Sequence, residues 1–495
     1  MGDGAMETVR ARLPFETERE LAENLGARLS RAGMDLPTDR EWLPGTLLVF
    51  ELSLASGRVV LRGEAVVSGR SPPDGPPGAR LRFLHLDEES HRLLDRIGPP
   101  PDNASRDWVL GIDLGTEGVR VAILRHAEPE PVRIGEEAVL PSWTALDASG
   151  RLLAGGAARA LAATDPSACV PSVKRWLGRR FEPATVRRAP FRAVEGERSE
   201  IAAVLRGEAV PLDRLCGELL RTARLLAEAS LRVPVARAVI AVPAHFDERQ
   251  RAAVARAAAL SGLDLERLVS ETAATARAYA AGRQLPRRRL AVIDLGAGTF
   301  SAGIVEVEGD SLEVVAAGGD SFLGGSEFDL RIAELLAQRF EEEEGVTLDE
   351  AARKRIRDAS ENAKLSLSSV RETEIVVPAV TVRGGVRVEL RTVLTLPEAE
   401  AAFADLVGRI AEDTVRLLAA RRLAPRDVDE VLLAGAAIRM PAVRRRLEML
   451  FPRAPIDMSA SSSVAAGAAF AGLPGSAVDW HDVFDAASPR ARAVP

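Results

Sequence analysis

A short motif that occurs twice constrains the fold of this chain more than any other feature. Residues 112–116 read Ile-Asp-Leu-Gly-Thr, and residues 293–299 read Ile-Asp-Leu-Gly-Ala-Gly-Thr. In both places an apolar strand pattern ends in an aspartate, a glycine turn follows, and a second apolar strand pattern returns. Asp113 and Asp294 are 294 − 113 = 181 residues apart. Because solenoid repeats recur every ~20–50 residues, one repeat at this distance indicates a duplicated domain with two facing lobes.

Each copy of the motif carries groups that suit a phosphate. Glycine lets the backbone approach a ligand closely, and consecutive N–H groups in such a turn bind anions. An aspartate beside the turn suits hydrated Mg²⁺, which prefers carboxylate, water and phosphate oxygens. Two ordinary β-hairpins whose aspartates cap the turns are the alternative. The pairing of the loops favours a clamp that holds the phosphates of a nucleotide from both sides.

Strand patterns alternate with helical patterns through most of the chain, which predicts an α/β fold. We expect hairpin strands at residues 108–113, 118–124, 290–294 and 301–306, further strands at 236–242 and 431–434, and helices at 250–259, 271–281 and 441–451.

Proline-rich segments predict where the chain divides. Residues 98–106, which contain Gly-Pro-Pro-Pro, are the expected linker between an N-terminal unit at 7–97 and a large unit at 107–474. Residues 475–495 are expected to form a poorly ordered tail.

The N-terminal unit has the pattern of a small, mostly β domain. Strand patterns at 46–54, 58–68 and 79–86 precede a charged helical pattern at 87–97. They predict a small barrel or curled sheet that the helix closes.

Composition excludes several classes of protein. Only three of the 65 basic residues are lysines, namely Lys174, Lys354 and Lys364, and none lies in a P-loop sequence. The five histidines form no H-E-x-x-H pair, the two cysteines are too few for a zinc ribbon, and no G-x-S-x-G motif occurs. Scarce aromatics (4%) and a net charge of −7 argue against nucleic acid. Without a signal peptide or an apolar run of ~18 residues, we expect a cytoplasmic protein that does not insert into membranes.

Eight segments of the large unit occur in a recognisable order. They are residues 111–116, 173–181, 238–246, 271–279, 294–300, 318–325, 361–368 and 435–441. Together they resemble the actin-like ATPase superfamily and, within it, the nucleotide-binding domain of the DnaK-type heat shock protein 70 chaperones. The resemblance implies two duplicated, ribonuclease H-like lobes that bind ATP or ADP with Mg²⁺.

The resemblance also implies a role for individual residues. Lys174 would contact the γ-phosphate and help to place the attacking water, and Glu271 would join the water and Mg²⁺ network. Glu361, Lys364 and Ser368 would hold the adenosine. The implied catalytic residues are Lys174, Glu271, Asp294 and Thr299; the implied nucleotide contacts are Gly115, Thr116, Gly296, Gly298, Gly324, Gly325, Glu361, Lys364, Ser368, Gly435 and Arg439; the implied metal residues, through water, are Asp113 and Asp294.

Two of these residues also fit plainer interpretations. Lys174 has arginines beside it and would suit a solvated basic face. Glu361 and Lys364, three residues apart, would suit a surface pair on a helix.

Several residues depart from the family pattern. Glu117 follows the first loop, where a carboxylate would repel phosphates unless it points away. Ala297 replaces a glycine of the second loop, and Ser461 stands where an acidic nucleotide contact is usual. The main phosphate groups remain, so we expect binding to survive and hydrolysis to be slow. About twenty residues follow Pro474, too few for the family's peptide-binding β-sandwich.

The N-terminal unit resembles a PilZ domain, with fewer matching residues. Ser30 and Gly33 fit the [DN]-x-S-x-x-G motif that binds cyclic di-GMP, but Arg28 takes its first position. Arg10 and Arg12 are spaced wrongly for the accompanying R-x-x-x-R motif. The pattern predicts a PilZ-like barrel and disfavours cyclic di-GMP as its ligand.

Three functions remain open at this point. The first is an ATP-binding, slowly hydrolysing chaperone-like protein with a PilZ-like accessory module, whose lobe closure a protein partner would read. The second is a nucleotide-binding signalling or scaffold module with little hydrolysis. The third is an actin-like small-molecule kinase, against which the Lys174 segment argues.

Overall fold

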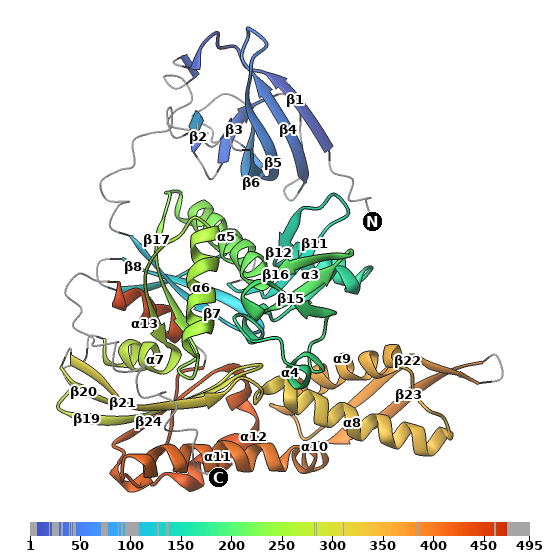
Figure 1. Cartoon of the computed structure of the whole chain (residues 1–495), viewed down its shortest axis with the longest axis vertical. Coiled ribbons are helices and arrows are strands. Elements are labelled where there is room, and N and C mark those ends of the chain that lie inside the picture. The colour runs from blue at the N-terminus through green and yellow to red at the C-terminus, as the bar shows by residue number, and fades with distance from the viewer. Residues whose placement is uncertain are drawn as a thin grey trace.

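Figure 1 shows an N-terminal sheet above a large unit of two lobes. The computed structural model describes residues 7–472 apart from residues 19, 22–28, 31–32, 39, 41, 43–45, 71–77, 88, 91–92, 95–107, 126–127, 135–137, 282, 284, 310, 384–385 and 460–461. The predicted linker at 98–106 and tail at 475–495 therefore lie outside the described residues, as does most of the helix predicted at 87–97.

The N-terminal unit is a six-stranded sheet in the order β1-β4-β5-β6-β3-β2. Its strands are β1 (Glu7–Arg12), β2 (Leu29–Ser30), β3 (Gly33–Pro37), β4 (Leu47–Ser53), β5 (Val59–Arg70) and β6 (Gly78–Leu86). The three predicted strands are confirmed as β4, β5 and β6. Their apolar faces form one core, in which Phe50 stacks on Phe83 with ring centroids 5.1 Å apart. Within the described residues β1 pairs only with β4 and β2 only with β3, so the sheet is open and the predicted closed barrel is not found.

Lobe I is built on the sheet β10-β8-β7-β17-β18, with β9 paired to β8. The strands are β7 (Val109–Leu114), β8 (Gly118–Arg125), β9 (Glu128–Val132), β10 (Leu140–Pro141), β17 (Arg237–Val242) and β18 (Asp264–Ser270). Helices α5 (Leu212–Leu231) and α6 (Glu248–Leu260) pack in the same core as this sheet. Smaller elements complete the lobe: β11 (Trp143–Leu146), β12 (Leu152–Ala154), α3 (Gly156–Ala162), β13 (Cys169–Pro171), α4 (Pro183–Val186), β14 (Ala193–Glu195), β15 (Ile201–Leu205) and β16 (Glu208–Pro211).

Lobe II repeats the same plan. Its sheet has the order β21-β20-β19-β24-β25, formed by β19 (Arg288–Leu295), β20 (Phe300–Glu308), β21 (Ser311–Asp320), β24 (Glu430–Ala434) and β25 (Ile456–Asp457). The rest of the lobe comprises α8 (Gly325–Glu344), α9 (Glu350–Leu367), β22 (Glu372–Arg383), β23 (Val386–Thr395), α10 (Leu396–Ala402), α11 (Ala404–Ala420) and α12 (Pro441–Leu450).

The two sheets correspond strand by strand. In each, an antiparallel hairpin (β7–β8 or β19–β20) is followed across the sheet by two parallel strands. This correspondence confirms the duplication that the repeated motif predicts, because β7 and β19 carry the two copies.

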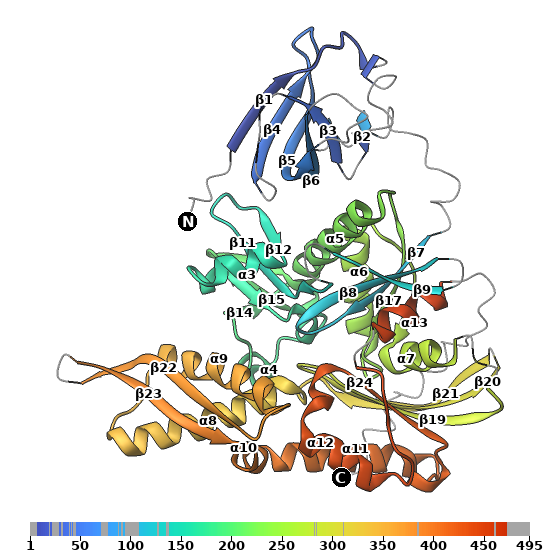
Figure 2. The same ribbon diagram turned by 180° about the vertical axis from the view of Figure 1, so that it is seen from behind.

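Two helices of small residues lie between the sheets, as both views show (Figures 1 and 2). They are α7 (Glu271–Ala280) and α13 (Ser463–Ala471), and they share one core with strands of both lobes. Their close approach depends on glycine, because a Cβ at Gly467 would lie 1.8 Å from the carbonyl oxygen of Ala274. Likewise, a Cβ at Gly111 of β7 would lie 2.1 Å from the carbonyl oxygen of Ala465.

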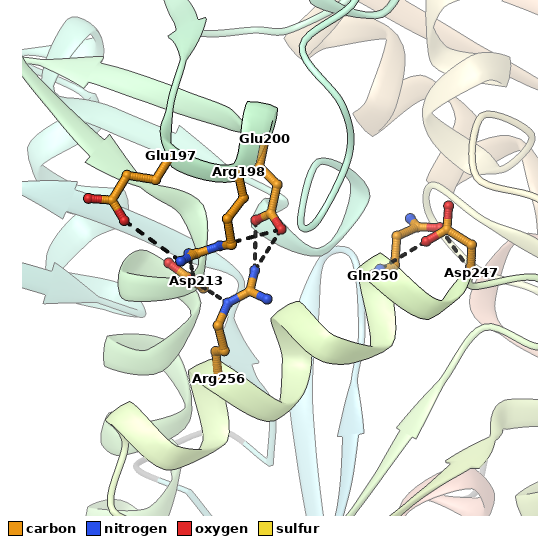
Figure 3. A network of polar contacts seen from close by, with 7 residues as sticks. All are labelled: Glu197, Arg198, Glu200, Asp213, Asp247, Gln250 and Arg256. Carbon is orange, nitrogen blue, oxygen red and sulfur yellow. Dashed lines mark hydrogen bonds and ion pairs between the residues drawn. The ribbon is translucent and has the colours of Figure 1, made fainter.

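A network of ion pairs fixes α6 within lobe I (Figure 3). Arg256 of α6 donates to both carboxylate oxygens of Glu200, at 2.9 and 2.7 Å, and to Asp213 of α5 at 2.7 Å. Arg198 also bonds Asp213, at 3.1 Å. One guanidinium group, that of Arg256, thus donates charge-assisted hydrogen bonds to two carboxylates, so α6 is anchored to both α5 and the β14–β15 hairpin.

In the described part of the chain, no helix combines the length and the apolar character needed to cross a lipid bilayer.

Candidate functional site

A cavity of about 180 Å³ lies between the two glycine turns. The turn between β7 and β8 lines it from lobe I, and the turn between β19 and β20 lines it from lobe II. The two motifs therefore face each other across one space. The predicted site residues that line this cavity are Asp113, Gly115, Thr116, Lys174, Glu271, Asp294, Gly296, Thr299, Gly435 and Arg439.

Three predicted glycines lie behind the cavity and shape it. A Cβ at Gly298 would lie 2.6 Å from the Cγ2 of Thr116, so the lobes come into contact at this residue. A Cβ at Gly324 would lie 2.7 Å from the carbonyl oxygen of Ala297. The N–H of Gly325 donates to the carbonyl oxygen of Gly296 at 3.0 Å. These glycines hold the second turn in place and do not line the cavity.

Lys364 also lies outside the cavity lining. Its Nζ donates to the carbonyl oxygen of Gly325 at 3.0 Å and to Asp329 at 2.8 Å, which ties α9 to the start of α8. Burial raises the pKa of Asp329 to about 6, against the opposing effect of the Lys364 ammonium. Lys364 is therefore buried and links two helices of lobe II, so it does not form the surface pair that was the alternative, and its contact with adenosine stays a prediction.

The predicted adenosine residues lie at the side of the cavity. Ser368 lines a wider depression of about 610 Å³ that shares Arg439 with the first cavity. Glu361 instead meets Glu117 of the opposite lobe: burial, then a hydrogen bond with Glu117 and the charge of that group, raise the pKa of Glu361. Glu117 is exposed and lines the cavity, and its carboxyl group interacts with Glu361.

Lys174 is the buried cation of the site. Its Nζ donates to Oε1 of Glu271 at 2.7 Å, and both side chains are almost fully buried, with 2% and 6% of their surface exposed. Ser301 Oγ donates to the other oxygen, Oε2 of Glu271, at 3.2 Å. The solvated basic face that the neighbouring arginines suggested is thus wrong for Lys174.

Two further carboxyl groups lie in the same buried space. Burial raises the pKa of Asp113, and the charges of Arg120 and Lys174 partly oppose it. Burial also raises the pKa of Asp294 well above its ordinary value, and the charges of Glu271 and Asp113 add to the effect. A cation bound between Asp113 and Asp294 would relieve this repulsion among the carboxylates.

The cavity has an unused hydrogen-bonding group. Thr116 Oγ1 is buried and has no hydrogen-bond partner, although nearly all such groups are paired in folded proteins. Among the described residues no three His, Cys, Asp or Glu side chains are arranged to ligate a metal directly. Two single aspartates beside glycine turns suit Mg²⁺, which keeps several of its waters. The residues present therefore fit Mg²⁺ held through water by Asp113 and Asp294.

Two features of the site were not predicted from the sequence: the partner of Asp113 and a contact between the lobes. Arg120 forms an ion pair with Asp113 at 3.5 Å, and the two are cross-strand partners in the β7–β8 hairpin. The hairpin register, counted back from the turn, could have identified this pair. The missed contact between the lobes had no signal in the sequence, because it joins segments about 150 residues apart.

That contact centres on a loop of lobe II that enters lobe I. Phe322, between β21 and α8, packs edge-to-face on Trp176 with ring centroids 5.4 Å apart. The guanidinium groups of Arg175, Arg179 and Arg188 lie 4.8, 4.9 and 4.0 Å from the Phe322 ring centroid. Arg175 follows Lys174 in the sequence, so the lysine that lines the cavity and the contact between the lobes belong to one short segment.

Two lobes of one plan that face each other across a glycine-lined cavity define the class of the large unit: it has the actin-like ATPase fold. A model of the Hsp70 protein family matches residues 109–482, which is well over half of the chain. The chain therefore belongs to the Hsp70 family, whose members bind ATP or ADP with Mg²⁺. The match confirms the predicted family and the actin-like fold of the large unit. It begins after the N-terminal unit, whose PilZ-like identity stays a prediction.

The raised pKa values of Asp113 and Asp294 predict how Mg²⁺ binding depends on pH. Without metal, the folded chain holds these protons more tightly than the unfolded chain does, so the carboxyls lower stability as pH rises from the ordinary pKa of 3.8 to the raised values. Mg²⁺ binds the charged forms. We therefore expect the rise in melting temperature caused by Mg²⁺ with ADP to grow as pH increases above 3.8, the ordinary pKa of these carboxyls. Thermal unfolding at each pH measures it, and a rise that shrinks with pH would contradict this assignment.

The Phe322 contact predicts a separate effect on lobe closure. Phe322→Ala removes one aromatic contact and three cation–π contacts between the lobes, worth roughly 2–3 kcal/mol together. We expect the affinity for Mg–ADP to fall by about tenfold or more, because binding needs both lobes in contact. Phe191→Ala is the matched control, since Phe191 also packs edge-to-face on Trp176, at 5.8 Å, but from within lobe I. Equal nucleotide affinity in the two variants would show that the contact does not support closure.

Proposed function

We propose that this chain binds Mg–ATP between its lobes and hydrolyses it slowly, as a chaperone-like ATPase. The observation that carries the proposal is the buried Lys174–Glu271 pair, which lies on the same cavity as both glycine turns and both aspartates. Phosphoryl transfer needs positioning and charge neutralisation rather than covalent work by the protein. The family supports ATP binding, and the details below are our inference for this chain.

Each residue has a definite task in this proposal. The backbone N–H groups of the two turns bind phosphate oxygens. The Lys174 ammonium donates to the terminal phosphate, whose charge grows in the transition state. Glu271 orients Lys174 and accepts a hydrogen bond from the attacking water. When bound, Mg²⁺ supplies neutralisation of the phosphate charges.

Slow turnover follows from the surroundings of Glu271. One of its oxygens accepts from Lys174 and the other from Ser301. A carboxylate that is already engaged at both oxygens orients a water weakly. The same observation favours the second candidate function, a nucleotide-binding scaffold with almost no hydrolysis. In both cases a protein partner would read lobe closure, which nucleotide occupancy biases.

Single-turnover hydrolysis separates the two candidates. ATP is mixed with a molar excess of the protein, and ADP formation is followed with time. Slow hydrolysis predicts one complete turnover at a rate well below the ~1 s⁻¹ that marks the low end of common enzymes. ATP that stays intact while bound would support the scaffold and overturn the ATPase. Hydrolysis that starts only when a small metabolite is added would support a kinase instead.

A further inference from the structure

A second cavity lies in lobe I and has no part in the proposed reaction. Its volume is about 470 Å³, within the ~300–1,000 Å³ range of ligand sites. Its walls are the segment that follows the Lys174 turn and the first turn of α6. Gly178 brings the two walls together: it has φ of +70°, and a Cβ there would lie 2.7 Å from the carbonyl oxygen of Arg249.

The lining of this cavity carries one more positive than negative charge. Three arginines line it, Arg179, Arg180 and Arg249, against two carboxylates, Glu182 and Asp247. In the described part of the chain neither Arg180 nor Arg249 forms an ion pair, and both side chains are exposed. Burial lowers the pKa of Arg179, and the charges of Arg175 and Arg188 lower it further, against the charges of Asp247 and Asp320. Within the described residues the guanidinium groups of Arg180 and Arg249 therefore have no carboxylate at ion-pair distance.

Gln250 adds an unused donor at the same place. It is the third residue of α6, where its side chain meets Asp247 (Figure 3), and only 5% of the residue is exposed. Its Oε1 accepts from the N–H of Asp247 at 3.3 Å, which completes the cap of the helix. Its Nε2 is buried without a hydrogen-bond partner. An unpaired buried donor loses free energy unless a ligand meets it.

We propose that this cavity binds a multiply charged oxyanion of the phosphate class. Arginine binds phosphate oxygens in pairs of parallel hydrogen bonds, which lysine does not. The N-terminal end of α6 adds a partial positive charge that favours an anion. The cavity is wider than one phosphate requires, so a short chain of phosphates fits its volume and charge best. Arg179 also stacks on Phe322, so the site lies beside the contact between the lobes.

Tripolyphosphate is the probe for this site. It is titrated calorimetrically into the full chain in buffer of fixed ionic strength that contains Mg²⁺ and excess ADP, so that Mg–ADP fills the cavity between the lobes, and the heat of Mg²⁺ binding to tripolyphosphate is subtracted with a titration without protein. We expect one binding event. Arg249→Ala should weaken it by about tenfold or more, because one charged hydrogen-bonding partner is lost.

Gln250→Glu is the sharper variant. A glutamate keeps the oxygen that caps α6, so the fold is retained, but it exchanges the unpaired donor for a negative charge. We expect it to weaken binding at least as much as Arg249→Ala. Arg387→Ala is the matched control, because Arg387 is an exposed arginine of β23 in the other lobe.

Three outcomes would overturn the proposal. The first is no heat beyond dilution. The second is equal affinity in wild type and in both variants, which would place the binding elsewhere. The third is tighter binding of a polyglutamate peptide than of tripolyphosphate with the same dependence on Gln250, which would make the ligand an acidic protein segment.

Discussion

Lys174→Ala is expected to slow ATP hydrolysis by about 10²–10³-fold, the loss that follows removal of one donor to the charge that develops in a transition state. The Lys174 ammonium is nearly fully buried and lies on the cavity that both phosphate turns line. In a water-excluded site its charge acts on the terminal phosphate with little screening. Single-turnover hydrolysis measures the effect.

Lys354, another of the three lysines of the chain, provides the control for this variant. Lys354→Ala removes an exposed lysine that pairs with Asp358 on the surface of α9, and we expect wild-type turnover. Lys174→Ala leaves Glu271 buried without its cation, which costs roughly 3–5 kcal/mol, so its unfolding must be measured as well. The double variant Lys174→Met with Glu271→Gln removes both charges together and should fold better. A folded Lys174 variant that hydrolyses ATP at the wild-type rate would contradict the proposed mechanism.

Gly435→Ala is expected to weaken nucleotide binding by about 100-fold or more, the second large effect. Gly435 follows β24 with φ of +81°, and a Cβ there would lie 2.3 Å from the carbonyl oxygen of Leu295 and 2.6 Å from Asp294 Oδ1. Leu295 begins the second phosphate turn. The added methyl group must push that turn or Asp294 out of place, and a misplacement of ~1 Å near reacting groups is enough for such a loss.

Gly150 provides the control for backbone strain. It also has φ of +81°, but a Cβ there would meet nothing within 4 Å. Gly150→Ala should cost about 1–2 kcal/mol of stability from the left-handed conformation and leave nucleotide affinity unchanged. Calorimetric titration with Mg–ADP compares the two variants. If both lose affinity equally, the contact of Gly435 with Leu295 is not what shapes the site.

The sequence was most informative where local pattern and repetition agree. The hairpins β7–β8 and β19–β20, the strands β17 and β24 and the helices α6, α7 and α12 lie within a few residues of their predicted ranges. Two copies of one motif were enough to predict two lobes of the same plan. Asp113, Lys174, Glu271 and Asp294 come together on one cavity although no short segment holds them.

The sequence was least informative where distant segments meet. The contacts of the Lys364 ammonium with Asp329 and the Gly325 carbonyl oxygen had no signal in the sequence, and its role at the adenosine stays a prediction. The approach of Glu117 to Glu361 also depends on how the lobes face each other, which no local pattern specifies. The open N-terminal sheet differs from the predicted barrel because β1 pairs in parallel with β4 and leaves its other edge unpaired in the described residues.

Binding of nucleotide at the cavity between the lobes is the central claim, and calorimetric titration of the full chain with ATP and with ADP tests it most directly. With Mg²⁺ present, we predict one site per chain for either nucleotide. Removal of Mg²⁺, or Gly435→Ala, should weaken binding sharply. No binding of either nucleotide with Mg²⁺, or binding that neither change affects, would contradict the account.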